Sequence, residues 1–143
     1  MTVDRVEVPE ELRQKIREHG EAAYSEECCG ILFGRKKEEG IFVIRETVPV
    51  KNRVSGKGSH YGIDPLELHA IEEEKESSDQ EILGFYHSHP DHPAILSEED
   101  AEEMVPGMLY LILSVPQGRS DRLRAWRKDP FTGKVSELRS CIS

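Results

Sequence analysis

Four residues between positions 87 and 100 have the types and the spacing of a metal site. His87 and His89 lie two residues apart at the end of the apolar segment 82–87, so in a strand both imidazoles point to one face. Ser97 and Asp100 are three apart, on one side of the first turn of a helix. Two imidazoles and the Asp100 carboxylate around one ion leave a fourth tetrahedral position open, as in a catalytic zinc site. This pattern predicts hydrolytic chemistry.

Ser97 and Asp100 also fit a purely structural role. A Ser-x-x-acid pattern is close to a helix capping box, with Asp in the place of Glu. The two roles are compatible, because capping would hold the helix that delivers Asp100 to the metal.

A general base could come from a pair of glutamates further upstream. Glu26 and Glu27 directly precede the apolar, glycine-bounded segment 28–34. A carboxylate near an activated water can take its proton and pass it to a leaving amine. The residues alone do not separate the two neighbouring glutamates.

The motif His87-Ser88-His89, with Ser97 and Asp100 at this spacing, resembles the full metal signature of the JAMM (MPN-plus) zinc metallopeptidases. Residues 26–34 resemble their upstream glutamate segment, and the resemblance covers nearly the whole chain. It is strongest for the short prokaryotic members. The resemblance implies one Zn²⁺ per chain bound by His87, His89 and Asp100, with Ser97 stabilising the oxyanion. By its offset from the glycines of that segment, Glu27 would be the general base.

The elements that must position these residues follow from periodicity and turn residues. Val8, Leu12, Ile16 and Ala23 recur at helical spacing after Pro9. An N-cap at Asp64 opens a second helix, and a short helix reaches from Ser97 to about 105. We expect helices over 9–23, 64–76 and 97–105, and strands over 28–34, 41–50, 61–63, 82–87, 109–115, 123–126 and 135–138.

This order favours a mixed α/β or α+β fold in one domain spanning residues 1–143. The resemblance implies a JAMM/MPN fold, a curved mixed β-sheet flanked by helices with a cytidine-deaminase-like architecture.

The charge of the chain indicates which classes of partner it can bind. It has 19 basic and 28 acidic residues, a net charge of −9, which argues against nucleic acid because phosphate binding needs a basic face. The net charge of residues 119–143 alone is +4, and that of residues 1–118 is −13. This basic third could receive an acidic protein through Arg122 and Arg124, or it could be ordinary strand surface.

Further features indicate a cytoplasmic protein. No apolar run reaches membrane-spanning length, the N-terminus lacks a signal pattern, and three cysteines suggest no disulfide framework. Cys28 and Cys29 lie in an apolar run, where buried, inert thiols are expected.

The resemblance also implies a substrate. Short prokaryotic JAMM enzymes cut the amide bond after the C-terminal diglycine of a ubiquitin-like β-grasp sulfur-carrier protein and release cysteine or a C-terminal extension. An extended tail could add as a strand at a sheet edge near the metal. A deubiquitinase-like isopeptidase and a non-enzymatic MPN scaffold are the alternatives, although silent scaffolds typically lack metal ligands.

Two other hydrolytic families share parts of the pattern. Residues 87–92 match the His-x-His-x-Asp-His loop of metallo-β-lactamase-like enzymes, but no histidine follows His92 to complete that site. A cytidine deaminase would need a Pro-Cys-x-x-Cys ligand pair, which is absent.

Overall fold

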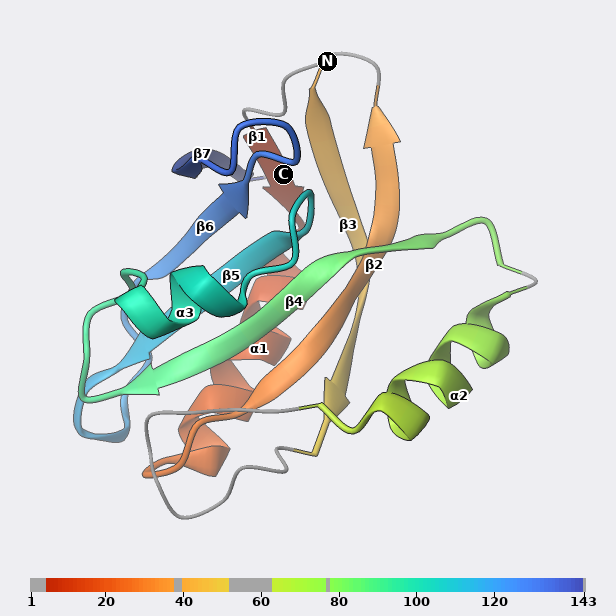
Figure 1. Ribbon diagram of the computed structural model, residues 1–143. Coiled ribbons are helices and arrows are strands. Elements are labelled where there is room, and N and C mark those ends of the chain that lie inside the picture. The colour runs from red at the N-terminus through yellow and green to blue at the C-terminus, as the bar shows by residue number, and fades with distance from the viewer. Residues whose placement is uncertain (1–4, 38–39, 52–62, 77, 143) are drawn as a thin grey trace.

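The computed structural model describes residues 5–37, 40–51, 63–76 and 78–142. Its strands are β1 (Arg5–Val8), β2 (Cys29–Lys37), β3 (Ile41–Val50), β4 (Glu81–Pro90), β5 (Leu109–Val115), β6 (Leu123–Lys128) and β7 (Val135–Ile142). Its helices are α1 (Glu10–Ala23), α2 (Pro65–Lys75) and α3 (Glu98–Glu103), with a 3₁₀ turn η1 at Pro116–Gly118 (Figure 1). The predicted order of helices and strands from position 9 onward is confirmed, except for the short strand predicted over 61–63, of which the structure describes only Ile63.

The strands form a closed barrel in the order β1-β3-β2-β4-β5-β6-β7. β1 runs parallel to both β3 and β7, and β4 runs parallel to β5, while the remaining neighbours are antiparallel. The expected mixed α+β sheet is confirmed, and the sheet in addition closes on itself. Each strand has two neighbours, but β1 pairs with β3 only over Ile41–Val43, and β2 pairs with β4 only as far as His87. Within the described residues, the later part of β3 and the end of β4 therefore keep an unpaired edge of the kind that tail addition needs.

The closing strand β1 was not predicted. Val8 fits the helical spacing of the residues that follow, yet it belongs to β1, where Val6 and Val8 alternate inward and are buried. A strand of four residues is too short to give a clear periodicity of its own. β7 likewise extends beyond the predicted position 138 to Ile142, because β1 pairs with its last residues.

Helix α1 packs through Leu12, Ile16 and Gly20 onto the core cluster that includes Leu113 and Val115 of β5. The packing is close at Gly20, where a Cβ atom would come within 2.6 Å of the Leu113 side chain. Glycine lowers helix propensity, but at position 20 its missing side chain lets the helix approach the sheet this closely.

Helix α2 begins as predicted, with Asp64 as its N-cap and Pro65 in its first turn. The Asp64 side chain accepts a hydrogen bond of 2.9 Å from the Leu66 backbone N–H. Leu68 and Ile71 pack on a second apolar cluster around Cys29, Ile31, Phe33 and Val50. α2 thus covers the opposite side of β2 from α1.

Residues 61–62 of the predicted short strand lie outside the described residues, and Ile63 belongs to no strand. Cys28 and Cys29 are buried, and burial raises the pKa of Cys28 to about 11 and that of Cys29 to about 12. The expected burial of both thiols is confirmed, and the raised pKa values favour the protonated form, which is the less reactive one. Within the described residues, no helix has the length and apolar character to span a membrane.

Candidate metal centre

Strand β4 presents His87 and His89 on the same face, as their spacing predicts. The strand runs to Pro90, three residues further than expected, so both histidines lie inside it. Its alternation places Tyr86 and Ser88 on the other face. The His87 side chain is 1% exposed and that of His89 is 12% exposed.

Helix α3 brings a carboxylate to these histidines. Ser97 is its N-cap: the Ser97 Oγ accepts the Asp100 backbone N–H at 3.0 Å, and the Asp100 Oδ2 accepts the Ser97 backbone N–H at 3.3 Å. The capping box predicted from Ser-x-x-Asp is therefore present. The same Oδ2 atom faces the imidazoles, so capping and ligand geometry coincide in one carboxylate.

Three donor atoms converge between β4 and α3. The Nε2 atoms of His87 and His89 are 3.2 Å apart, and the Asp100 Oδ2 lies 3.1 Å from the His89 Nε2 and 3.8 Å from the His87 Nε2. Zinc bonds of about 2.0 Å at tetrahedral angles separate ligand atoms by about 3.3 Å. Both the spacing and the two-imidazole, one-carboxylate donor set therefore fit a tetrahedral zinc site that keeps one position open.

Glu27 lies beside this triangle and Glu26 does not. One carboxylate oxygen of Glu27 is within 4.8 Å of ligand atoms of both His87 and His89. Glu27 is 4% exposed, whereas Glu26 is on the surface. The tertiary structure thus separates two glutamates that their chemistry alone does not.

The neighbouring Ser88 holds the Glu27 segment against β4. Its Oγ accepts the Cys28 backbone N–H at 2.8 Å, and its own backbone N–H donates to the Cys28 carbonyl at 3.1 Å. Ser88 is fully buried. This pair of bonds fixes the chain one residue from Glu27 to the strand that carries the histidines.

The electrostatics of the three donors differ. Complete burial lowers the pKa of His87, which favours the neutral imidazole that can bind a metal. Burial alone would lower the pKa of His89, but its bonds to Asp100 and to the Pro93 carbonyl, at 2.8 Å from Nδ1, raise it overall. Burial opposes ionisation of Asp100, yet the two histidines outweigh it and lower its pKa.

The bond between His89 and Pro93 also orients a ligand. A histidine whose Nδ1–H donates to a backbone carbonyl has its Nε2 lone pair free for a metal. Pro93 belongs to the loop that joins β4 to α3. The position of this loop therefore affects both His89 and Asp100.

Two residues that the sequence analysis did not select hold this loop. Asp91 accepts the Tyr24 hydroxyl and the Gln117 backbone N–H, each at 2.7 Å, from a left-handed backbone with φ 60°. The Trp126 indole donates to the Ala94 carbonyl at 3.3 Å. Asp is among the few residues that tolerate a left-handed backbone, so an Asp directly after the Pro that ends β4 is a signal that could have marked Asp91.

The alternative metal patterns lack support in this geometry. Asp91 points to Tyr24 and Gln117, and His92 is exposed, so a His-x-His-x-Asp-His site does not assemble. His69 is exposed on α2 and pairs with Glu73 at 2.7 Å. His60 lies outside the described residues.

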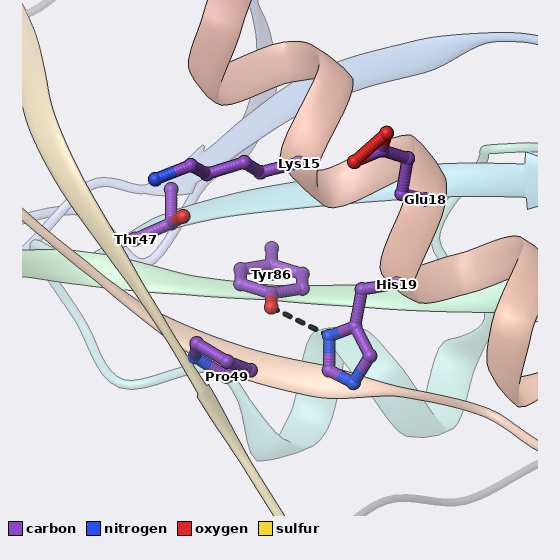
Figure 2. Close-up of a pocket in the computed structure, with 6 residues that line it drawn as sticks. All are labelled: Lys15, Glu18, His19, Thr47, Pro49 and Tyr86. Carbon is purple, nitrogen blue, oxygen red and sulfur yellow. Dashed lines mark hydrogen bonds between the residues drawn. The ribbon is translucent and has the colours of Figure 1, made fainter.

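A separate pocket of about 320 Å³ lies on the α1 side of β4. Figure 2 shows it between Lys15, Glu18 and His19 of α1 and Thr47 and Pro49 of β3, with Tyr86 at its base. The His19 Nδ1 is hydrogen-bonded to the Tyr86 hydroxyl at 2.7 Å. No other imidazole or buried carboxylate lines this pocket, so it has no metal-binding set among the described residues.

Residues 9–129 match the family described as prokaryotic homologs of the JAB domain. The chain is 34% identical over 136 residues to the Desampylase of Haloferax volcanii, covering 92% of this chain and 94% of that one. It is 36% identical over 118 residues to the Desampylase of Pyrococcus furiosus, covering 82% and 77%.

Solved structures resemble the whole fold. A protein from Desulfitobacterium hafniense matches with a TM-score of 0.83 and 23% identity over 96% of this chain and 92% of that one. A protein from Salinibacter ruber matches with a TM-score of 0.69 and 30% identity over 97% and 91%. At its low identity, the first likeness concerns the fold alone.

Proposed function

The chain belongs to the JAMM family, as one of the prokaryotic homologs of the JAB domain, and from this we propose that it is a zinc-dependent peptidase acting on ubiquitin-like proteins. Membership of this family makes it a hydrolase. The observation that carries the proposal is the triangle of His87, His89 and Asp100 donor atoms with Glu27 beside it.

Each residue of the centre has a role in amide hydrolysis. His87, His89 and Asp100 would hold the zinc. When bound, zinc would lower the pKa of a coordinated water to about 7 and polarise the scissile carbonyl. Glu27 would accept a proton from the attacking water and return it to the nitrogen of the leaving amine. Its burial next to the histidines keeps this carboxylate within reach of their open side.

Ser97 would stabilise the oxyanion that forms at the carbonyl. Its oxygen accepts the Asp100 N–H, so the hydroxyl hydrogen stays available as a donor. A donor of this kind is worth a few kcal/mol in the transition state. The capping box fixes the position of this hydroxyl relative to Asp100.

For the substrate, we propose the amide bond after the C-terminal diglycine of a ubiquitin-like β-grasp sulfur-carrier protein, with release of cysteine or a short extension. A second candidate is the isopeptide bond between such a protein and a lysine of another protein. The relatives from Haloferax volcanii and Pyrococcus furiosus favour this second substrate, because a desampylase acts on ubiquitin-like protein conjugates.

The two substrates can be compared directly. Zinc-loaded protein is incubated with a sulfur carrier extended by one cysteine after its diglycine, and separately with a carrier joined to a lysine side chain. Intact mass then identifies the bond that is cut. Cleavage after the second glycine that a chelator abolishes is the expected result. If both substrates stay intact while zinc is bound, the proposed function is wrong.

A further inference from the structure

We propose that the outer face of β6 and β7, with the cations Arg122, Arg124 and Arg139, is a docking surface for an acidic face of the protein substrate. The proposal rests on the proposed function, because the partner is the ubiquitin-like protein whose C-terminal tail is cut. It specifies where the body of that protein lies while its tail enters the metal centre.

The strand register places these arginines on the face that carries the metal ligands. His87 of β4 is level with Ile112 of β5, and Ile112 is level with Arg124 of β6. His89 is level with Ser114, whose backbone N–H donates to the Arg122 carbonyl at 2.9 Å. Residues level across paired strands point to one face, so Arg122 and Arg124 lie two strands from the histidines, about 10 Å away, and Arg139 of β7 lies one strand further.

A shallow groove of about 630 Å³ follows this surface between β6 and β7. Its charged lining residues are Arg122, Arg124, Arg139 and Glu137. The groove is therefore a positive region on a chain whose net charge is −9. A local field of this sign attracts an acidic protein surface and repels a basic one.

The arginines do not contribute equally. Arg124 forms two bonds to the Glu137 carboxylate, at 2.6 and 2.7 Å, and its guanidinium lies 5.3 Å from the Trp126 ring centroid. Its charge is thus largely compensated within the chain. Among the described residues, no carboxylate forms an ion pair with Arg122 or Arg139, and both are exposed. These two are the cations open to a partner, which revises the expectation that Arg122 and Arg124 form the contact.

The distance from this surface to the metal centre fits a protein with an extended tail. An extended chain advances about 3.3 Å per residue, so about three to five tail residues span the two strands. The body of a folded partner can therefore contact β6 and β7 while the bond after its tail reaches the open side of His87 and His89. A peptide with only two residues before the scissile bond spans about 7 Å and would not reach the arginines.

The test compares two double charge reversals. R122E/R139E removes the two open cations, and K15E/R45E makes the same change in net charge at exposed residues of α1 and β3. The metal-loaded enzymes are assayed at low and high salt on a folded extended carrier and on a short peptide with the same C-terminal sequence. We expect the KM of R122E/R139E for the folded carrier to rise about tenfold at low salt, with kcat unchanged, and the effect to shrink at high salt.

Different failures are distinguishable. If the folded carrier is cut with an unchanged KM, or if KM rises equally for the peptide or for K15E/R45E, the docking surface is wrong and the proposed function stands. If the wild-type enzyme cuts neither carrier nor peptide, the proposed function fails, and the docking proposal with it. A loss of oligonucleotide binding in R122E/R139E, with no change in KM, would assign the surface to nucleic acid and overturn the proposal.

Discussion

Strand β4 carries a polar, histidine-containing cluster on each of its two faces, and the clusters differ in what they can bind. On the outer face, His87 and His89 converge with the Asp100 carboxylate at 3.1 to 3.8 Å, with Glu27 close by. On the inner face, His19 forms one hydrogen bond of 2.7 Å with Tyr86. The first cluster combines several donors and negative charge around one point, while the second pairs two groups that are neutral at pH 7.

The comparison shows that a histidine beside a buried polar group does not by itself indicate a metal site. The Tyr86 hydroxyl is deep in the protein and needs a partner, which His19 supplies. The ring is accommodated because residue 30 is glycine: a Cβ there would lie 2.0 Å from the Tyr86 ring. This arrangement explains the inner cluster as packing, whereas packing gives no reason for Asp100 and two imidazoles to share one point.

The largest expected effect comes from Glu27, which distinguishes a reactive centre from a structural metal site. In Glu27→Gln the amide cannot take a proton, so kcat should fall by about 10²- to 10⁴-fold. Zinc content, measured by elemental analysis, should stay at one per chain. Glu26→Gln is the matched control, since this exposed neighbour should retain full turnover. Normal turnover in Glu27→Gln would exclude it as the base.

A smaller effect is expected from a change at Asp91, which holds the loop between β4 and α3 next to the outer cluster. Asp91→Ala removes the bonds to Tyr24 and Gln117 and should lower zinc affinity about tenfold, because the Pro93 and Asp100 positions loosen. Competition with a metallochromic chelator measures this affinity. Asp91→Asn keeps an acceptor for the Gln117 N–H and should recover most of it. Equal zinc affinity in all three proteins would show that the loop holds its shape without Asp91.

Removing the hydroxyl of the inner cluster should change stability and leave chemistry intact. Tyr86→Phe deletes one hydrogen bond, and water can reach the half-exposed His19, so we expect the free energy of unfolding to fall by about 1 kcal/mol. Urea denaturation gives this value, and turnover should stay at the wild-type level. A large loss of turnover with little loss of stability would mean that the inner cluster serves the reaction.

The smallest effect concerns the pH dependence of stability. Burial lowers the pKa of His19 below its ordinary value of 6.5. Between these two pKa values, His19 binds more protons in the unfolded chain than in the folded one. The contribution of neutral His19 to the free energy of unfolding is therefore full above pH 6.5 and is lost as the pH falls toward the folded pKa. His19→Gln should show a shallower decrease of the urea midpoint between pH 7 and pH 5. Parallel curves for the variant and the wild type would contradict this assignment.

Much of the fold and of the centre could be predicted because the signals are local. The two-residue spacing of His87 and His89 in a strand and the three-residue spacing of Ser97 and Asp100 at a helix start each determine a shared face. The short strand β1 could not be predicted, since its partners β3 and β7 come from distant parts of the chain. The support from Asp91 also depends on residues 67 and 26 positions away.

The sequence by itself determined the donor types, their local spacing and the family that they resemble. Only the tertiary structure decided that Glu27, and not Glu26, faces the histidines, and that Arg122 and Arg124 share a face with them. The reason is physical: side-chain direction within one element follows from its backbone geometry, whereas strand order and register depend on contacts between distant segments. The distances from the metal-binding histidines to Glu27 and to the surface of β6 and β7 are therefore set by the strand order and register of the closed barrel.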